Sequence, residues 1–266
     1  MSEPTPDLSV IVISHGHEAM LARCIGSLDA ALAGLAAEIL VIDNLPAGGA
    51  AAAVAGLPAR VLGSTVPVGF AANVNRGAAA TTGRHLLFLN PDTEHRSGRI
   101  ADTLAFLAAR PGIGLLGCTL VGEDGAPQRS FRRFPSVAVP LARGLGADRW
   151  PWRPAWYARA MMDAAWQEDP FPVDWVFGAF LLMRRADFER VGGMDEGYRL
   201  YYEDVDLAWR LRRLGLGTWV HPGLRFLHEH QRASAKRPFS RAWRWHVASA
   251  IRYFAKTAGR RPDPPA

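Results

Sequence analysis

The 266 residues suffice for one large domain or two small ones, and a hydrophobic content of 49% supports a substantial core. The net charge of +6 indicates an anionic partner, which could be nucleic acid, a nucleoside diphosphate or an anionic lipid surface. The cysteines, Cys24 and Cys118, are too few for a disulfide framework or a thiolate metal site, no stretch is apolar for long enough to span a membrane, and the first residues show no signal-peptide pattern.

The first part of the chain alternates predicted strands with predicted helices. After a loose terminus at 1–7, the β-branched run Leu8–Ser14 predicts a buried parallel strand, and leucines at three- and four-residue steps predict a helix over 18–37. The other expected elements are strands at 38–42, 60–62 and 86–89, a short helix at 47–56, and a glycine-bounded turn at 68–77 that leads into a helix ending near 81. This order is typical of a parallel α/β sheet with right-handed crossovers.

The strand at 86–89 ends abruptly at Asn90-Pro91-Asp92. Pro91 has no backbone N–H and a fixed φ, so the strand must stop and turn there. Asp92 is therefore expected at the carboxyl end of a buried strand, the edge at which open α/β sheets bind ligands. A carboxylate there can hold a hard divalent cation beside a phosphate, although the tripeptide is also ordinary turn chemistry.

A helix at 100–110 and a strand at 113–120 are expected before residues 128–166, which interleave arginine with tryptophan and phenylalanine. One interpretation is an irregular insertion whose tryptophans cover the core, and the other is a surface that faces lipid headgroups. No nucleic-acid recognition module is visible, and both a Walker loop and a dinucleotide-binding glycine fingerprint are absent. These absences disfavour P-loop enzymes and dehydrogenases.

The apolar segment 173–184 is interrupted by Gly178 and Ala179, whose small side chains would let a ligand approach the backbone closely. A short helix at 185–191 and short strands at 218–220 and 224–227 are expected beyond it. The last strand leads into His228-Glu229-His230, where imidazoles are either surface residues or metal ligands. The tail at 239–261 has the pattern of a basic amphipathic helix.

The stretch YYEDVD opens a further predicted helix that ends at 214. Asp206 has a structural explanation on this helix, because Arg210 follows it at i,i+4. Glu203 and Asp204 can complement the dipole of the first turn. Asp204, however, falls on the same stripe as the leucines at 207, 211 and 214, where a carboxylate is costly unless it is used or paired. We therefore interpret Asp204 as functional.

The chain carries, in this order, LSVIVIS, a strand ending in Asp43-Asn44, VGFAANVNRG, LLFLNPDT, VFGAFLLMRR, GGMDEGY, YYEDVDLAWRLRRLG and a late histidine. This order resembles that of the inverting family 2 glycosyltransferases with the GT-A fold, and within them the bacterial rhamnosyltransferases. The resemblance covers about residues 8–258 and implies an α/β GT-A fold, in which a Rossmann-like, mostly parallel central sheet is flanked by helices and followed by a C-terminal amphipathic helix.

By this resemblance, Asn90-Pro91-Asp92 stands where the family carries its Asp-x-Asp motif, with Asn90 replacing the first carboxylate. Asp92 would ligate Mg²⁺ or Mn²⁺ that bridges the donor diphosphate, with His228 as a second ligand and His230 as the alternative to it. Asp204, the second residue of the Glu-Asp pair, matches the catalytic base.

The resemblance also implies a nucleotide-sugar site. Ser14, Asp43 and Asn44 would hold the base and ribose, and His15 stands where the family often has tyrosine. The remaining residues expected to line this site are Gly69, Asn75, Asn90, Asp92, Gly178, Ala179 and Glu203.

The implied function is metal-dependent inverting transfer of a sugar, such as rhamnose from dTDP-rhamnose, to a hydroxyl of a lipid-linked glycan in cell-envelope polysaccharide synthesis. The chemistry also fits the residues themselves, since one buried carboxylate can deprotonate an acceptor and a metal on Asp92 can neutralise the departing diphosphate. A nucleotidyltransferase would need a glycine- and lysine-rich loop after the first strand, and His15-Gly16-His17 is not one. A non-catalytic, lectin-like or scaffold module is the other alternative, which the joint presence of Asp92, Asp204 and His228 disfavours.

The expected organisation is a disordered terminus at 1–7, a GT-A domain over 8–238, and a basic amphipathic helix and tail over 239–266. Within the domain, 8–125 would be the nucleotide-sugar-binding half and 126–238 the acceptor and catalytic half. The arginine- and tryptophan-rich segments 128–166 and 239–258 predict a cytoplasmic, peripheral enzyme at the anionic inner face of the plasma membrane. No nucleic-acid partner is expected.

Overall fold

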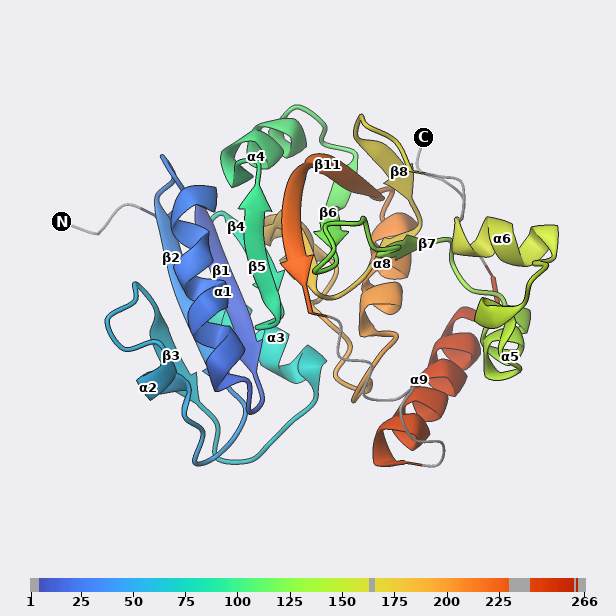
Figure 1. The fold of residues 1–266 in the computed structure, drawn as a ribbon, viewed down its shortest axis with the longest axis horizontal. Coiled ribbons are helices and arrows are strands. Elements are labelled where there is room, and N and C mark those ends of the chain that lie inside the picture. Colours follow the sequence, from blue (N-terminus) through green and yellow to red (C-terminus); the bar gives the residue numbers. More distant parts are fainter. Residues whose placement is uncertain (1–4, 163–165, 230–239, 261, 263–266) are drawn as a thin grey trace.

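Figure 1 shows the computed structural model, which describes residues 5–162, 166–229, 240–260 and 262. Its centre is a twisted nine-stranded sheet within these residues, and a short pair, β7 (Phe131–Arg132) and β9 (Trp175–Val176), lies beside it. The strands of the sheet, in spatial order, are β3 (Arg60–Gly63), β2 (Ala37–Asp43), β1 (Leu8–Ser14), β4 (His85–Leu89), β10 (Phe180–Arg184), β6 (Ile113–Val121), β11 (Gly217–His228) and β5 (Thr93–Ser97), with β8 (Phe171–Val173) also pairing with β11.

Most strands of the sheet run in the same direction. β1 is parallel to β2 and β4, β2 is parallel to β3, and β6 is parallel to β11. The strands β5, β8 and β10 run the opposite way, and β10 lies between β4 and β6. The expectation of a mostly parallel α/β sheet is thus confirmed.

Helices cover both faces of the sheet. Alternate residues of β1 explain this arrangement, because Val10 and Val12 belong to one core cluster while Ile11 and Ile13 belong to the other. The first cluster is completed by α1 (Glu18–Ala31), α2 (Ala50–Ala53) and α4 (Ile100–Ala108). The second is completed by α3 (Phe70–Ala79), α7 (Arg185–Arg190), α8 (Glu203–Arg213) and α9 (Arg241–Thr257).

A small helical unit stands at one end of the molecule, on the right in Figure 1. It consists of α5 (Ala138–Gly144), the short 3₁₀ helix η1 (Ala147–Arg149) and α6 (Ala155–Met161). Its own apolar cluster surrounds the fully buried Tyr157, whose hydroxyl donates to Asp148 at 2.5 Å. This satellite core is separate from the two cores of the sheet.

Several element boundaries differ from the sequence expectation. The helix predicted over 18–37 ends at Ala31, because a turn with a left-handed Gly34 (φ 80°) intervenes before β2. β5 was not anticipated, since its sequence TEHRS is polar and becomes a strand only by pairing with β11. The two strands expected at 218–220 and 224–227 form one continuous strand, because a register shift absorbs Pro222-Gly223.

Candidate active site

The predicted donor-site residues at the ends of β1 and β2 are brought together. Ser14 is paired with Asp43 across the two strands, and the N–H of Asn44 donates to the carbonyl of Ser14 at 2.9 Å. The Ser14 hydroxyl is buried and has no hydrogen-bond partner among the described residues. A buried hydroxyl without a partner at this edge is suited to a ligand.

Asn44 ties three segments together. Its Oδ1 accepts from the N–H of Val68 at 2.9 Å, its Nδ2 donates to the carbonyl of Val68 at 3.0 Å, and Nδ2 lies 3.2 Å from His15 Nδ1. Asp43 accepts from the backbone N–H groups of Leu45 and Ala50, at 3.2 Å each. In this structure both side chains hold loops around the edge of the sheet.

Gly69 and Asn75 lie against the loop that precedes α8. A Cβ added to Gly69 would meet the carbonyl oxygen of Tyr198 at 3.1 Å, so the two backbones are in close approach. Asn75 donates to the carbonyl of Met194 at 2.9 Å and accepts from its N–H at 2.8 Å. Both residues therefore connect α3 to the segment that leads to Asp204.

Asp92 and His228 lie close together at the ends of β4 and β11. Oδ1 of Asp92 is buried, lacks a hydrogen-bond partner among the described residues, and is 3.8 Å from Nε2 of His228. Burial, with a smaller contribution from Glu229, raises the pKa of Asp92 to about 6. His230 lies outside the described residues.

A carboxylate oxygen and an imidazole nitrogen at this separation fit a shared divalent cation. The described residues contain no cluster of three or more His, Cys, Asp or Glu side chains that could enclose one. Mg²⁺ in transfer enzymes is commonly held by one or two protein ligands, with the remaining positions filled by substrate phosphates and water. The pair is thus compatible with a metal that binds together with the donor.

Asp204 is held by two backbone amides at the start of α8. The N–H of Gly178 donates to Oδ2 at 3.0 Å, and the N–H of Val205 donates to Oδ1 at 2.8 Å. The next residue, Ala179, accepts from the N–H of Asn90 at 3.1 Å. The Gly178-Ala179 segment therefore joins Asp204 to the Asn90-Pro91-Asp92 turn.

Glu203 and Asp204 differ in their electrostatic environment. Burial raises the pKa of both carboxyl groups, and the neighbouring Asp204 charge raises that of Glu203 further. Asp204 receives two backbone hydrogen bonds that favour its ionised form, whereas Oε2 of Glu203 has no partner among the described residues. These contacts favour the protonated form of Glu203 and the ionised form of Asp204.

The burial pattern of α8 corrects one sequence expectation. Asp204, expected on the buried stripe, is partly exposed, and Asp206, expected on an outer face, has 0% exposure. The reason is that α8 is enclosed on most sides, so its polar residues cannot be assigned by helical periodicity alone. The expected Asp206–Arg210 pair is present, with Nε 2.7 Å from Oδ2.

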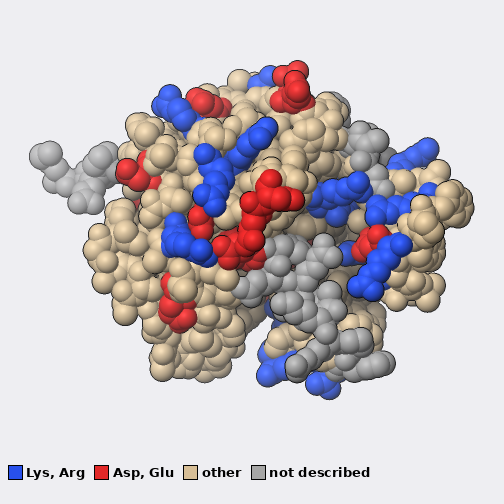
Figure 2. Space-filling model, in the orientation of Figure 1, with Lys and Arg blue, Asp and Glu red and all other residues tan. Residues whose placement is uncertain are grey.

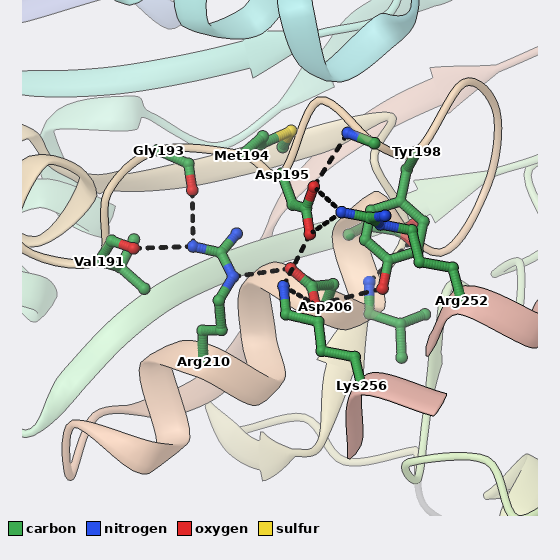
Figure 3. A network of polar contacts seen from close by, with 12 residues as sticks. Val191, Gly193, Met194, Asp195, Tyr198, Asp206, Arg210, Arg252 and Lys256 are labelled. Carbon is green, nitrogen blue, oxygen red and sulfur yellow. Dashed lines mark hydrogen bonds and ion pairs between the residues drawn. The ribbon is translucent and has the colours of Figure 1, made fainter. Parts of the chain in front are cut away.

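Figure 3 shows the network around Asp206. Lys256 of α9 lies between two carboxylates, with Nζ 2.7 Å from Asp206 and 2.8 Å from Asp195. Arg252 also donates to Asp195, and although burial acts in the opposite sense, these cations lower the pKa of Asp195 to about 2. The other contacts are those of Tyr198 Oη with Asp206 at 3.3 Å, and of Arg210 with the carbonyls of Val191 and Gly193.

The backbone just before Asp204 has an unusual conformation. Tyr201 and Tyr202 both adopt positive φ, 64° and 68°, which costs non-glycine residues of order 1–3 kcal/mol each. α9 supports this segment, because Tyr202 packs on Tyr253 with ring centroids 5.4 Å apart and Ser249 donates to the carbonyl of Leu200 at 2.9 Å. The position of Asp204 therefore depends on α9.

Comparison with known families decides the class of protein. The model of Glycosyl transferase family 2 matches residues 9–192, about two thirds of the chain.

The chain belongs to glycosyl transferase family 2.

A second family model, described as the N-terminal domain of galactosyltransferase, matches residues 163–232 of this glycosyltransferase. The chain is 29% identical over 260 residues to the N-acetylglucosaminyl-diphospho-decaprenol L-rhamnosyltransferase of Mycobacterium tuberculosis, and the match covers 93% of this chain and 84% of the relative. It is 28% identical over 263 residues to the rhamnosyltransferase WbbL of Escherichia coli K12, covering 93% and 92%. The expected resemblance to bacterial rhamnosyltransferases is confirmed.

Solved structures confirm the GT-A fold. GalNAc-T7 with UDP, GalNAc and Mn²⁺ superimposes with a TM-score of 0.65 at 15% identity over 96% of this glycosyltransferase, which spans about half (48%) of the GalNAc-T7 chain. The mannosyltransferase PcManGT of Pyrobaculum calidifontis, in complex with GDP-Man and Mn²⁺, gives 0.62 at 18% identity, covering 98% of this chain and 67% of that chain. The family match and the two rhamnosyltransferase relatives support a glycosyltransferase over the nucleotidyltransferase and the non-catalytic module.

Sequence reasoning missed two groups of residues in this glycosyltransferase. Lys256 and Arg252 were assigned to a membrane-facing helix, and no local signal indicates that they pair with Asp195 and Asp206. The sequence places Gln128 only within an arginine-rich segment, yet its side chain contacts His228. The one feature of the sequence that could have indicated a role for Gln128 is the polarity of QRSFRRFP, which follows soon after a buried strand.

Proposed function

We propose that this protein is a metal-dependent inverting glycosyltransferase that moves rhamnose from dTDP-rhamnose to a hydroxyl of a lipid-linked glycan in cell-envelope polysaccharide synthesis. The observation that carries the proposal is Asp204, a carboxylate fixed by two backbone amides and linked through Gly178-Ala179 to the turn that bears Asp92. The choice of rhamnose is supported by the similarity to two rhamnosyltransferases. The choice of a lipid-linked acceptor is supported by the one that acts on N-acetylglucosaminyl-diphospho-decaprenol.

The reaction is a single displacement at the anomeric carbon of the donor. Asp204 accepts the proton of the acceptor hydroxyl as the new C–O bond forms, while the bond between the anomeric carbon and the diphosphate oxygen breaks. The bonding pair leaves with the nucleoside diphosphate. A retaining mechanism would need a carboxylate nucleophile, and Glu203 is poorly suited to that role because it is buried and its raised pKa favours the protonated form.

Asp92 and His228 would hold a Mg²⁺ or Mn²⁺ ion in this proposal. When bound, the ion supplies positive charge that neutralises the departing diphosphate. The support for this role is the buried Oδ1 of Asp92, which has no hydrogen-bond partner in the part of the chain that the structure describes and lies 3.8 Å from the imidazole.

The proposed site of action is an anionic membrane surface. Among the described residues, no helix combines the length and apolarity needed to cross a bilayer. The helical unit of α5, η1 and α6 exposes large apolar side chains, and basic side chains gather over the same region at the right of Figure 2. We name this the α5–α6 surface and define it by Leu141 (64% exposed), Leu145 (77%), Trp152 (74%) and Trp156 (47%) with Arg143, Arg149, Arg153 and Arg159.

Release of nucleoside diphosphate tests the proposed reaction. The protein should release dTDP from dTDP-rhamnose in the presence of Mn²⁺ and a polyprenyl-diphosphate-linked acceptor, and EDTA should abolish the release. UDP-N-acetylglucosamine and GDP-mannose serve as competing donors. Faster turnover of either would reject rhamnose, and undiminished turnover in EDTA would reject the metal.

A further inference from the structure

Gln128 contacts the predicted metal ligand His228 from the side opposite Asp92. Its Oε1 is 2.9 Å from Nδ1 of the imidazole, whereas Nε2 of the same ring faces Asp92 at 3.8 Å. Gln128 follows the hairpin after β6, where its N–H donates to the carbonyl of Leu120 at 2.7 Å. Its backbone is thus anchored to the sheet, and its side chain is directed at one nitrogen of one ring.

The orientation of the Gln128 amide follows from its other contacts. Nε2 of Gln128 donates to the carbonyl of His228 at 2.8 Å and lies 3.4 Å from the carbonyl of Val121. The reverse orientation would place Oε1 against these carbonyl oxygens and an NH₂ group against the ring. Oε1 therefore faces the imidazole, and a carbonyl oxygen can only accept.

The tautomer of His228 follows in turn. To make the 2.9 Å contact, Nδ1 must carry the proton and donate it to Oε1 of Gln128. In a neutral imidazole the other nitrogen, Nε2, then presents its lone pair, and it is the nitrogen on the side of Asp92. Metal-binding histidines commonly donate their second nitrogen in this way, which fixes both tautomer and ring orientation.

We propose that Gln128 is a positioning residue that locks His228 in the Nδ1–H tautomer, so that Nε2 is directed to a divalent cation shared with Asp92. The metal part of this inference rests on the proposed function, but the tautomer part does not. It assigns a role to the QRSFRRFP segment, whose first residue is Gln128.

The tautomer can be measured without metal or donor. Long-range ¹H–¹⁵N correlation spectra, recorded above the titration range of imidazole, distinguish protonated from unprotonated ring nitrogens, and a His228→Gln variant assigns the signal. The wild-type protein should show His228 as Nδ1–H. An Nε2–H form in the wild type overturns the proposal directly.

Two variants then separate the effect of the hydrogen-bond acceptor at residue 128 from that of the packing of its side chain. Gln128→Met keeps the length of the side chain but removes the acceptor, so the Nε2–H tautomer should increase. Gln128→Glu keeps an acceptor for Nδ1–H and should preserve the wild-type tautomer. Glu123→Gln, on the exposed turn between β6 and Gln128, is the matched control. Circular dichroism establishes that each variant is folded.

Metal affinity is the second measurement. Titration with Mn²⁺, followed by the electron paramagnetic resonance signal of the free ion, should show affinity reduced about 10–100-fold in Gln128→Met. Gln128→Glu should retain most of the affinity, with dTDP absent or present. A folded Gln128→Met variant with the wild-type tautomer overturns the proposal, and so does wild-type Mn²⁺ affinity in this variant where Asp92→Ala weakens Mn²⁺ binding. If Asp92→Ala also leaves Mn²⁺ affinity unchanged while the tautomer follows residue 128, the metal role in the proposed function fails and the positioning of the ring stands.

Discussion

The N–H of Gly178 donates to Oδ2 of Asp204 at 3.0 Å, across 26 residues of sequence. This contact joins the segment before β10 to the start of α8. A backbone donor keeps its position when side chains change, so it is a dependable way to orient a carboxylate. The hydrogen bond also stabilises the ionised form of Asp204, which is the form that a general base requires.

Replacement of Asp204 by asparagine should remove the proton acceptor and preserve the shape of the side chain. We expect turnover to fall by roughly two to four orders of magnitude, the usual scale for loss of a positioned base. Affinity for dTDP with Mn²⁺ should change little, because the donor does not require proton transfer to bind. Steady-state kinetics and calorimetry measure the two quantities, with exposed Asp124→Asn as the control. Normal turnover in Asp204→Asn would reject the assignment.

The rate should decline in acid at a higher pH than an ordinary aspartate would give. Burial raises the pKa of Asp204 above its usual 3.8, and protonation of this group removes the base. The raised pKa of Glu203 keeps that group neutral while Asp204 titrates, so in Glu203→Gln the acidic decline should stay near its wild-type position and turnover near neutrality should be retained. A pH profile of kcat in both proteins checks this, and loss of turnover in Glu203→Gln would show that the Glu203 carboxyl itself is needed.

Glu203 should also make folding stability dependent on pH. Because its folded pKa lies above the unfolded value of 4.5, its favourable contribution is complete below 4.5 and is lost as pH rises through the folded pKa. The Glu203→Gln variant lacks this loss, so its stability relative to the wild type should increase with pH above 4.5. Urea unfolding at several pH values measures the difference. A constant difference would mean that Glu203 is ionised in the native protein.

Asp92→Ala should weaken binding of nucleoside diphosphate in the presence of Mn²⁺, since the substitution removes one of the two expected metal ligands. In the wild type, EDTA should weaken binding of the same ligand, whereas in Asp92→Ala it should have little further effect. Calorimetry with dTDP provides the measurement, and Asp102→Ala, an exposed carboxylate on α4, provides the control. If EDTA weakened dTDP binding as much in Asp92→Ala as in the wild type, the metal would bind elsewhere.

Lys256→Met should destabilise the protein by about 1–3 kcal/mol, because it removes an ionised partner from the fully buried Asp206. Arg210 remains on the other carboxylate oxygen, so complete unfolding is not expected. Arg244→Met, an exposed position on the same helix, is the matched control. Turnover should fall in Lys256→Met even where the protein is folded, since α9 supports the backbone before Asp204. A stability equal to that of Arg244→Met would contradict the network.

The α5–α6 surface should bind anionic vesicles reversibly. Each basic side chain near such a surface contributes about 1 kcal/mol, and this attraction is screened by salt. The protein should therefore pellet with vesicles containing phosphatidylglycerol at low salt and be released at high salt. A Trp152→Ser, Trp156→Ser double variant should pellet less, whereas Val66→Ser, an exposed apolar position outside this surface, should not differ from the wild type. Wild-type protein that stays in the supernatant at low salt would indicate a soluble acceptor.

Local sequence pattern predicted the parts of the fold that depend on local physics. The continuous β-branched run of β1 and the proline at 91 determine a strand and its end without reference to the rest of the chain. The position of β10 between β4 and β6, the strand β5 and the burial of Asp206 depend on pairing between distant segments. Periodicity within one helix carries no information on what encloses that helix, so Asp206 was misplaced while its pairing with Arg210 was predicted.

Placement of β10 between β4 and β6 also limits how this enzyme can be divided. A fragment ending near residue 125 would contain β4 but not β10, and the backbone edge that β10 covers would be open along Leu86–Leu89, all of which are 0% exposed in the intact sheet. Uncovered apolar strand edges associate with one another. A chimera that exchanges the first 125 residues to change the donor must therefore exchange β10 as well, although β10 lies more than fifty residues further along the chain.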